Sequence, residues 1–339
     1  MLTIAIGVIA ATGACAKRDT DASADSRAGD SVKVAVTASP GALAPAAADA
    51  QMQAVLDQLA ALGPKPIETL TAAEARKQPT PADAAKAVMA KEGKPTKPDA
   101  SVVTVDRTIP GAAGPMPTRI YTPAGATAPL PVIVYYHGGG WVIANKDVYD
   151  GGARALSKMA NAIVVSIDYR LAPEHKFPAA HEDAFAAYQW ALKNAGSIKG
   201  DPTRIALAGE SAGGNLALAT AMTARDKGVK LPVAVIAVYP VAGSDTTTAS
   251  YVENANAKPL NRAMMGWFVR QVIRSPADLK DPRIDLVHAN LTGLPPVTIV
   301  AAQIDHGAAH EFFGMGMVVD KARDAEQYAA DALTRAFGK

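Results

Sequence analysis

A serine between two glycines is the first feature of this sequence that could do covalent chemistry. Residues 209–213 read Gly-Glu-Ser-Ala-Gly, which fits the G-x-S-x-G pattern of a nucleophile elbow, a sharp turn from a strand into a helix. An apolar run at 205–208 precedes the motif, and a helical pattern begins near Gly214. The glycines permit a sharp turn without a Cβ clash, and the helix N-terminus supplies partial positive charge. We therefore predict that Ser211 is a nucleophile.

Three consecutive glycines offer the hydrogen-bond donors that such a nucleophile needs. Residues 137–141 read His-Gly-Gly-Gly-Trp and follow a strand expected at 132–136. Glycines leave the backbone N–H groups bare, so that a ligand can approach them closely. Acyl transfer requires N–H donors aimed at the developing oxyanion, and the residue after the nucleophile commonly provides one. We expect an oxyanion hole that draws on the glycine run, Gly138, Gly139 and Gly140, and on Ala212.

Together with an intervening stretch, these motifs resemble a known family. Residues 168–175 read DYRLAPEH, and residues 209–215 read GESAGGN. With the HGGG run they resemble, in order, the hormone-sensitive-lipase-like (bacterial family IV) carboxylesterases of the α/β-hydrolase superfamily. The resemblance covers roughly residue 51 to the C-terminus. It implies oxyanion donors at Gly139, Gly140 and Ala212, and a structural rather than catalytic His175.

The same resemblance implies a fold, a substrate and a mechanism. The family has an α/β-hydrolase fold with a helical cap, acts on esters with short acyl chains, and needs no metal or organic cofactor. Glu210 stands where the family more often has aspartate.

The partners of Ser211 should follow it in the order serine, acid, histidine. Asp305 comes shortly after the apolar run 297–300 and resembles the acid position of the family. His310 opens the stretch His-Glu-Phe-Phe-Gly, which resembles the family's histidine loop. His306 also follows Asp305 but lacks that motif. We predict that His310 removes the proton of Ser211 and that Asp305 holds the imidazole tautomer.

The spacing of these two residues departs from the family. Only residues 306–309 separate Asp305 from His310, whereas a parallel crossover needs a dozen or more residues. The usual Pro-Leu after the aspartate is also absent. We therefore expect that the last helix-strand unit is missing. Five residue steps reach up to ~17 Å, so a direct connection could still bring His310 to Ser211, or could misplace the imidazole and cost activity.

Alternating elements must position these residues. Apolar, β-branched runs predict strands, and helical patterns lie between them, which together indicate a mostly parallel α/β sheet flanked by helices. The expected strands are 102–105, 118–121, 132–136, 163–167, 205–208, 233–238 and 297–300, and the expected helices include 152–159, 179–195, 214–227, 263–273 and 318–337.

The chain divides into a leader, a tether, a cap and a catalytic domain. Residues 1–15 suit a secretory signal, and the run ending at Cys15 resembles a lipobox, so we expect an exported protein, either a periplasmic one or an outer-membrane-anchored lipoprotein. A plain signal with an incidental cysteine is the alternative. Residues 16–50 contain few large apolar side chains and predict a disordered tether. Residues 51–100 should form cap helices, and 101–339 the catalytic domain with a cap insertion at about 240–290.

Composition limits the partners, and the motifs leave alternatives open. The 34 basic and 32 acidic residues are well mixed, which argues against nucleic acid as a partner; a small-molecule ester remains the expected partner. The main alternative is a non-catalytic small-molecule-binding protein of the same fold, with a triad disabled by the lost segment. Cleavage of amides in place of esters is a third possibility, because both reactions use the same elbow and oxyanion hole.

Overall fold

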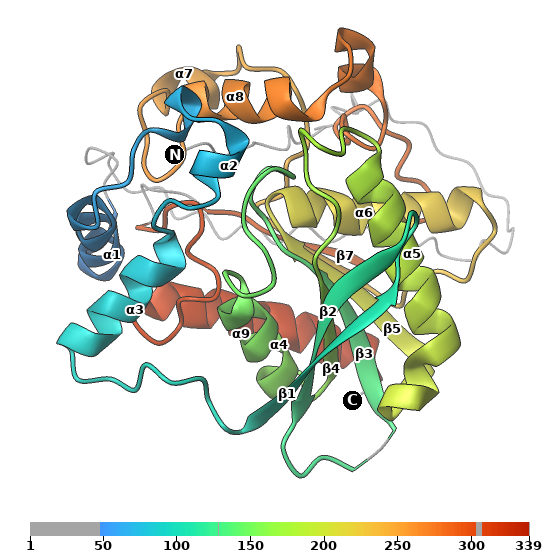
Figure 1. Cartoon of the computed structure of the whole chain (residues 1–339). Helices are drawn as coiled ribbons and strands as arrows, with labels where there is room; N and C mark the ends of the chain where they lie inside the picture. The colour runs from blue at the N-terminus through green and yellow to red at the C-terminus, as the bar shows by residue number, and fades with distance from the viewer. Residues whose placement is uncertain (1–47, 128, 303–306, 339) are drawn as a thin grey trace, which may run out of the picture.

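A seven-stranded sheet forms the centre of the molecule (Figure 1). The computed structural model describes residues 48–127, 129–302 and 307–338; the expected leader with Cys15, most of the expected tether, Asp305 and His306 lie outside them. The strand order is β1-β2-β4-β3-β5-β6-β7. The strands are β1 (Val102–Pro110), β2 (Pro115–Pro123), β3 (Leu130–Tyr136), β4 (Ile163–Ile167), β5 (Gly200–Glu210), β6 (Val235–Val238) and β7 (Val297–Val300).

The sheet is antiparallel at one end and parallel in its main part. β1 pairs with β2 and β2 with β4 in antiparallel orientation, whereas β3, β4, β5, β6 and β7 pair in parallel. Every residue of β3, β4 and β6 is buried. Continuous burial is what parallel strands covered on both faces require. The expected mostly parallel α/β architecture is confirmed.

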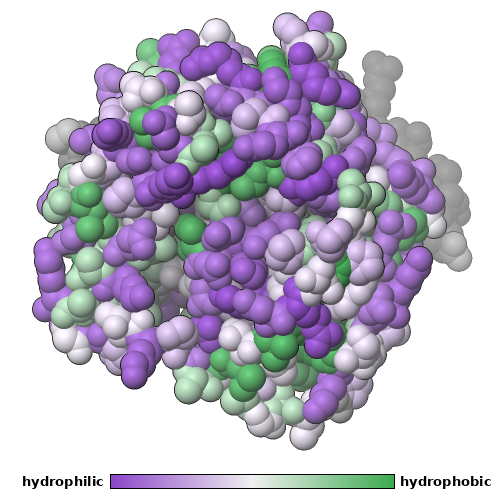
Figure 2. Space-filling view, viewed as in Figure 1, coloured by the Kyte–Doolittle hydropathy of each residue, from purple (hydrophilic) through white to green (hydrophobic). Residues whose placement is uncertain are grey.

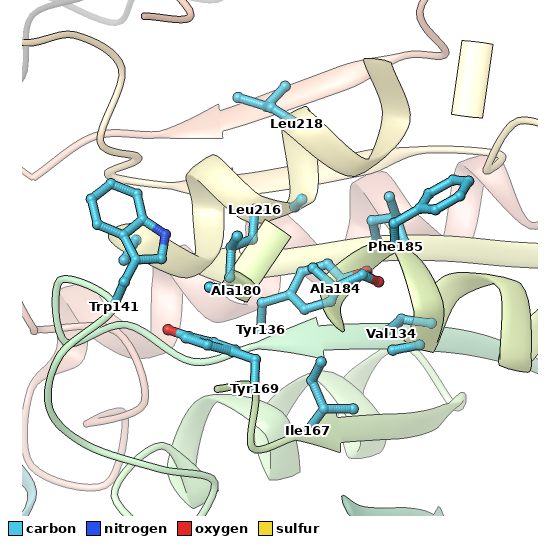
Figure 3. Packing of buried hydrophobic residues seen from close by; sticks show 14 of the residues in the cluster. Val134, Tyr136, Trp141, Ile167, Tyr169, Ala180, Ala184, Phe185, Leu216 and Leu218 are labelled. Atoms are coloured by element: carbon cyan, nitrogen blue, oxygen red, sulfur yellow. Dashed lines mark hydrogen bonds between the residues drawn. The ribbon is translucent and has the colours of Figure 1, made fainter. Parts of the chain in front are cut away.

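Helices cover both faces of the sheet. Alternate residues of β3 point to opposite faces: Val134 and Tyr136 pack with α5 (Ala179–Asn194) and α6 (Ala212–Asp226). Figure 3 shows side chains of these two helices over the sheet on this face. On the other face, Tyr135 packs with α4 (Asp150–Met159) and α9 (Asp320–Ala336).

A group of short helices lies over the carboxyl ends of the parallel strands (Figure 1). It consists of η1 (Ile67–Thr69), α2 (Ala72–Ala75), α7 (Ala249–Glu253), α8 (Arg262–Val272) and η3 (Pro276–Lys280). Trp267 of α8 donates its indole N–H to the carbonyl of Leu70 at 3.0 Å, which joins the early segment to the insertion. We call this group the cap.

The other two early helices pack elsewhere. α1 (Ala50–Ala61) and α3 (Pro81–Lys91) contact each other and share an apolar cluster with Phe312 and Val319. The N–H of Asp49 donates to the carbonyl of Gly307 at 3.1 Å. These helices therefore support the segment that carries His310.

The described residues after β7 form loops and the single helix α9 but no further strand. This agrees with the expected loss of the last helix-strand unit. β7 consequently lies at an edge of the sheet, where Ile299 is 43% exposed. In the described part of the chain, no helix is both long and apolar enough to cross a membrane. The face seen in Figure 2 is mostly hydrophilic, with small hydrophobic patches.

Candidate active site

Ser211 lies at the turn from β5 into α6 with a left-handed backbone, φ +54°. Its N–H donates to Val238 O of β6 at 2.9 Å, and its carbonyl accepts from the N–H groups of Asn215 and Val241, each at 3.1 Å. A non-glycine residue with positive φ is strained and needs support from its surroundings. These three bonds hold the serine in that conformation, and the residue is only 5% exposed.

The two glycines around Ser211 are required by space rather than by their dihedral angles. A Cβ on Gly213 would lie 1.9 Å from the carbonyl oxygen of Tyr136, and a Cβ on Gly209 would lie 2.3 Å from the carbonyl oxygen of Gly213. The backbone of the elbow therefore packs directly on the end of β3. The close approach brings Ser211 and the glycine run after β3 to the same place.

His310 stands next to the serine. Its Nε2 lies 3.0 Å from Ser211 Oγ, and its side chain is almost fully buried beside the ring of Tyr239. Burial lowers the pKa of His310 to about 3, so the imidazole is neutral near pH 7 and Nε2 can accept a proton. Within the described residues Nδ1 has no hydrogen-bond partner, and the predicted acid, Asp305, lies outside them.

The glycine run presents free amides at the same place. Gly139 and Gly140 have φ values of +90° and +59° and line the cavity that contains Ser211. Among the described residues, no backbone or side-chain group accepts from either N–H. Ala212 is the first residue of α6, so its N–H has no partner inside the helix. These three N–H groups are free to bind a negatively charged oxygen.

Gly138 does not line this cavity. A Cβ on it would lie 2.2 Å from the hydroxyl of Tyr149, and its carbonyl accepts from the hydroxyl of Tyr169 at 3.3 Å. These contacts hold the backbone at the start of the glycine run. The role of Gly138 as an oxyanion donor stays a prediction.

The cavity has a volume of about 1000 Å³ and is enclosed by the ends of the strands, the cap and α1, which contributes Leu56 and Leu59. α8 contributes Met264, Met265 and Phe268, and Ile67 of η1 also lines the cavity. Phe268 covers Gly140, where a Cβ would lie 2.4 Å from the ring. An apolar pocket with a few convergent polar groups is typical of a small-molecule site.

Two carboxyl groups lie near the histidine: Glu210 is buried behind Tyr239, and Glu311 is half-buried beside the imidazole. Glu210 accepts hydrogen bonds from the hydroxyls of Tyr135 and Tyr239, and burial raises its pKa well above the ordinary value. Glu311 accepts from the hydroxyl of Tyr149 at 2.6 Å, and its Oε1 lies 3.6 Å from His310 Nε2. Burial raises the pKa of Glu311 to about 7.

The motifs predict no role for Glu311. Adjacency to His310 is its only signal in the sequence, and neighbours in a chain usually point apart. His175, expected to be structural, is exposed and does not line the cavity. The neighbouring Ala172 carbonyl and Glu174 carboxylate bind Arg76, which also donates to Val142 O beyond the glycine run. In the part of the chain that the structure describes, no group of three or more histidine, cysteine or acidic side chains could hold a metal.

Known proteins share this architecture. The family model described as alpha/beta hydrolase fold matches residues 133–309. Carboxylesterase NlhH of Mycobacterium tuberculosis is 43% identical over 56% of this chain and 61% of its own length. Ethyl acetate hydrolase of Pseudomonas putida is 28% identical over 79% of this chain and 91% of its own length.

A solved structure extends the similarity over most of the chain. The hyperthermophilic esterase from the archaeon Pyrobaculum calidifontis superimposes with a TM-score of 0.74 and 32% identity, over 85% of this chain and 98% of its own. The chain spans about three fifths of the length of the first curated relatives that it matches. The matched segment, the sheet and the elbow show that this chain belongs to the α/β-hydrolase family.

Proposed function

We propose that this protein is a serine esterase that hydrolyses carboxylic esters with short acyl chains through an acyl-enzyme intermediate. One observation carries the proposal: Ser211 Oγ lies 3.0 Å from His310 Nε2 in a cavity that also contains the free amides of Gly139 and Gly140. A nucleophile, a base and an anion site in one pocket form the constellation that acyl transfer needs. The esterases among the relatives support the same conclusion.

In the acylation step, Ser211 Oγ attacks the ester carbonyl carbon while its proton passes to His310 Nε2. The carbonyl oxygen becomes an oxyanion, which accepts hydrogen bonds from the N–H groups of Gly139, Gly140 and Ala212. The bond between the carbonyl carbon and the alcohol oxygen then breaks, and His310 returns the proton to the departing alcohol.

In the deacylation step, a water molecule replaces the alcohol. His310 Nε2 takes a proton from the water as its oxygen attacks the acyl carbon, and the same proton returns to Ser211 Oγ when the carboxylic acid leaves. Asp305 is proposed to orient the imidazole through Nδ1, the nitrogen that has no partner among the described residues. All steps use protein groups and water, so the proposal includes no metal or organic cofactor.

The apolar lining supports an uncharged substrate with a small acyl group. Phe268 covers Gly140 closely, which limits the room beside the reacting carbonyl. The name of the Pseudomonas putida relative, ethyl acetate hydrolase, is consistent with small acyl and alcohol groups.

Hydrolysis of p-nitrophenyl butyrate tests the proposal. We expect Ser211→Ala and His310→Ala to lower kcat/KM by at least about 10³-fold, because serine and histidine act as a unit. Matched controls are Ser197→Ala and His288→Ala, which alter exposed residues outside the cavity and should keep the wild-type rate. A fluorophosphonate probe should label the wild type and the controls but not Ser211→Ala. Equal labelling of Ser211→Ala and wild type, or turnover no faster in wild type than in Ser211→Ala, would contradict the proposal.

A further inference from the structure

Glu311 directs its carboxyl group at the reacting nitrogen of His310. The two residues are neighbours in the chain, and Glu311 has a left-handed backbone with φ +70°. This conformation is uncommon for a non-glycine residue, and such strain collects at functional sites. It turns the Glu311 side chain into the cavity beside Ser211, with 21% of the side chain exposed.

The position of this carboxyl group is fixed by Tyr149. The tyrosine hydroxyl donates to Glu311 Oε2 at 2.6 Å. Tyr149 is itself held, because its backbone carbonyl accepts from Ala153 N in the first turn of α4 and its hydroxyl packs against Gly138. The other carboxyl oxygen, Oε1, is left facing His310 Nε2 at 3.6 Å. That distance is too long for a hydrogen bond, so Ser211, at 3.0 Å, remains the hydrogen-bond partner of Nε2.

The charge on Glu311 matters when His310 becomes protonated. Burial disfavours the imidazolium, as the lowered pKa of His310 shows, yet acyl transfer requires this cation. Among the described residues, Glu311 is the acidic group that approaches the imidazole within ion-pair distance. A carboxylate a few ångströms away in a partly buried site favours the charged form of its partner.

We propose that Glu311 is a positioning residue whose carboxylate, held by Tyr149, stabilises the His310 imidazolium that forms when Ser211 attacks. This inference rests on the proposed esterase function. Glu311 exchanges no proton in the reaction: the proton moves from Ser211 Oγ to His310 Nε2 and then to the leaving alcohol. This stabilisation at Nε2 acts in addition to any contact through which a partner of His310 Nδ1 orients the ring.

The proposal has a consequence for the pH dependence of kcat. Only the ionised carboxylate stabilises the imidazolium. The pKa of Glu311 is raised to about 7, because the effect of burial outweighs the opposing effect of the Tyr149 hydrogen bond. kcat should therefore rise with pH through about 7 as Glu311 ionises. The other titratable side chains that face Glu311 come from four strand ends and from its own loop: Tyr135, Tyr169, Glu210, Tyr239 and His310.

The tyrosines and His310 do not titrate near pH 7. Burial raises the pKa values of the tyrosines above their ordinary value, and it raises that of Glu210 well above the ordinary value of a carboxyl. Burial lowers the pKa of His310 to about 3. Glu210 bonds to the hydroxyls of Tyr135 and Tyr239, and among the described residues it does not come within ion-pair distance of His310 as Glu311 does. This geometry assigns the rise in kcat near pH 7 to Glu311.

The test is the pH profile of p-nitrophenyl butyrate hydrolysis for wild type and Glu311→Gln. Glutamine keeps the size of the side chain and an acceptor for Tyr149 but carries no charge. We expect kcat on the alkaline plateau to fall about 10- to 100-fold with KM within about twofold, and the rise near pH 7 to disappear. In Tyr149→Phe the hydrogen bond that lowers the Glu311 pKa is lost, so the rise should move to higher pH.

Glu326→Gln is the matched control. Glu326 is another buried glutamate that holds the same loop, through Gly314 N and Gly316 N, but it does not line the cavity. Its substitution should leave the pH profile of kcat unchanged. The inference is wrong if Glu311→Gln keeps the wild-type kcat and profile, if Tyr149→Phe leaves the rise in place, or if Glu326→Gln reproduces the Glu311→Gln profile, since the effect would then be a loop disturbance.

The controls separate this inference from the proposed function. If hydrolysis depends on Ser211 but Glu311→Gln keeps the wild-type kcat and pH profile, only the role of Glu311 is overturned. Absence of Ser211-dependent hydrolysis in the wild type overturns both. Thermal unfolding of each variant identifies a loss of folding, and Tyr149→Phe still decides the question if Glu311→Gln does not fold.

Discussion

At the scale of single residues, the space around Gly213 constrains the elbow most tightly. We predict that Gly213→Ala abolishes Ser211-dependent hydrolysis and lowers the free energy of unfolding by about 3 kcal/mol, because its Cβ would meet the Tyr136 carbonyl oxygen at 1.9 Å. Activity and urea unfolding measure the two effects. Gly196→Ala is the control, since a Cβ there meets no atom within 4 Å and the residue is exposed; it should change stability by less than about 0.5 kcal/mol. Wild-type activity in Gly213→Ala would show that the elbow tolerates a shift of the backbone.

A sequence motif predicts the role of a residue well when the residues that determine its geometry are its neighbours in the chain. The neighbours of Ser211 in sequence determine its turn, and the pairing of Ser211 with His310, expected from the motif order, is present in the structure. Glu311 depends instead on a positive φ and on Tyr149, which is 162 residues away in the chain. No sequence pattern encodes that contact. The orienting role of Asp305 stays a prediction.

At the scale of elements, α9 anchors the loop that carries His310. Glu326 of α9 accepts from Gly314 N at 3.0 Å and from Gly316 N at 3.1 Å, and burial raises its pKa to about 7. A carboxyl whose pKa is higher in the folded than in the unfolded state binds more protons when folded, so its contribution to stability is lost as pH rises from about 4.5 to about 7.

Glu326→Gln should remove this loss. We predict that the free energy of unfolding of the variant, relative to wild type, increases by roughly 1 to 3 kcal/mol between pH 5 and pH 8. Chemical denaturation at both pH values measures the difference. The exposed Glu253→Gln should show no such increase. A constant difference between Glu326→Gln and wild type would mean that Glu326 is ionised in the folded protein throughout this range.

The strands were predictable from apolar runs to different extents. The strands expected at 163–167 and 297–300 have the same bounds in the structure as β4 and β7, because their apolar runs end where pairing ends. β1 extends to Pro110, beyond the expected end at 105, although most of its residues are exposed. Pairing with β2, including the Arg119–Asp106 ion pair at 2.6 Å, determines that extension, and cross-strand pairing is invisible in a single run of sequence.

At the scale of the whole molecule, β7 is the last strand of the sheet that the described residues form, and the stability of the sheet should fall toward that edge. In a parallel ladder the amides of successive residues point alternately to the two neighbouring strands. Tyr239 N donates to Val300 O and Val235 N to Pro296 O, so the Val300 amide faces β6 and the Ile299 amide faces outward. β7 pairs with β6 alone among the described strands, so no described strand accepts a hydrogen bond from the Ile299 N–H.

Hydrogen exchange can measure this gradient amide by amide. We predict that the Ile299 amide exchanges orders of magnitude faster than the Val300 amide beside it and the Ile236 amide in β6, because an outward amide on an edge strand needs no unfolding to meet water. Val300 and Ile236 serve as controls for global opening, since both belong to the paired ladder between β6 and its neighbours. Equal protection at Ile299 would mean that another strand covers this edge, and exchange measured at several protein concentrations would then show whether a second copy of the chain provides it. Rapid exchange confined to the outward amides would mean that β7 is held by α9 and by its hydrogen bonds to β6. These two contacts would then also hold the start of the segment that carries His310.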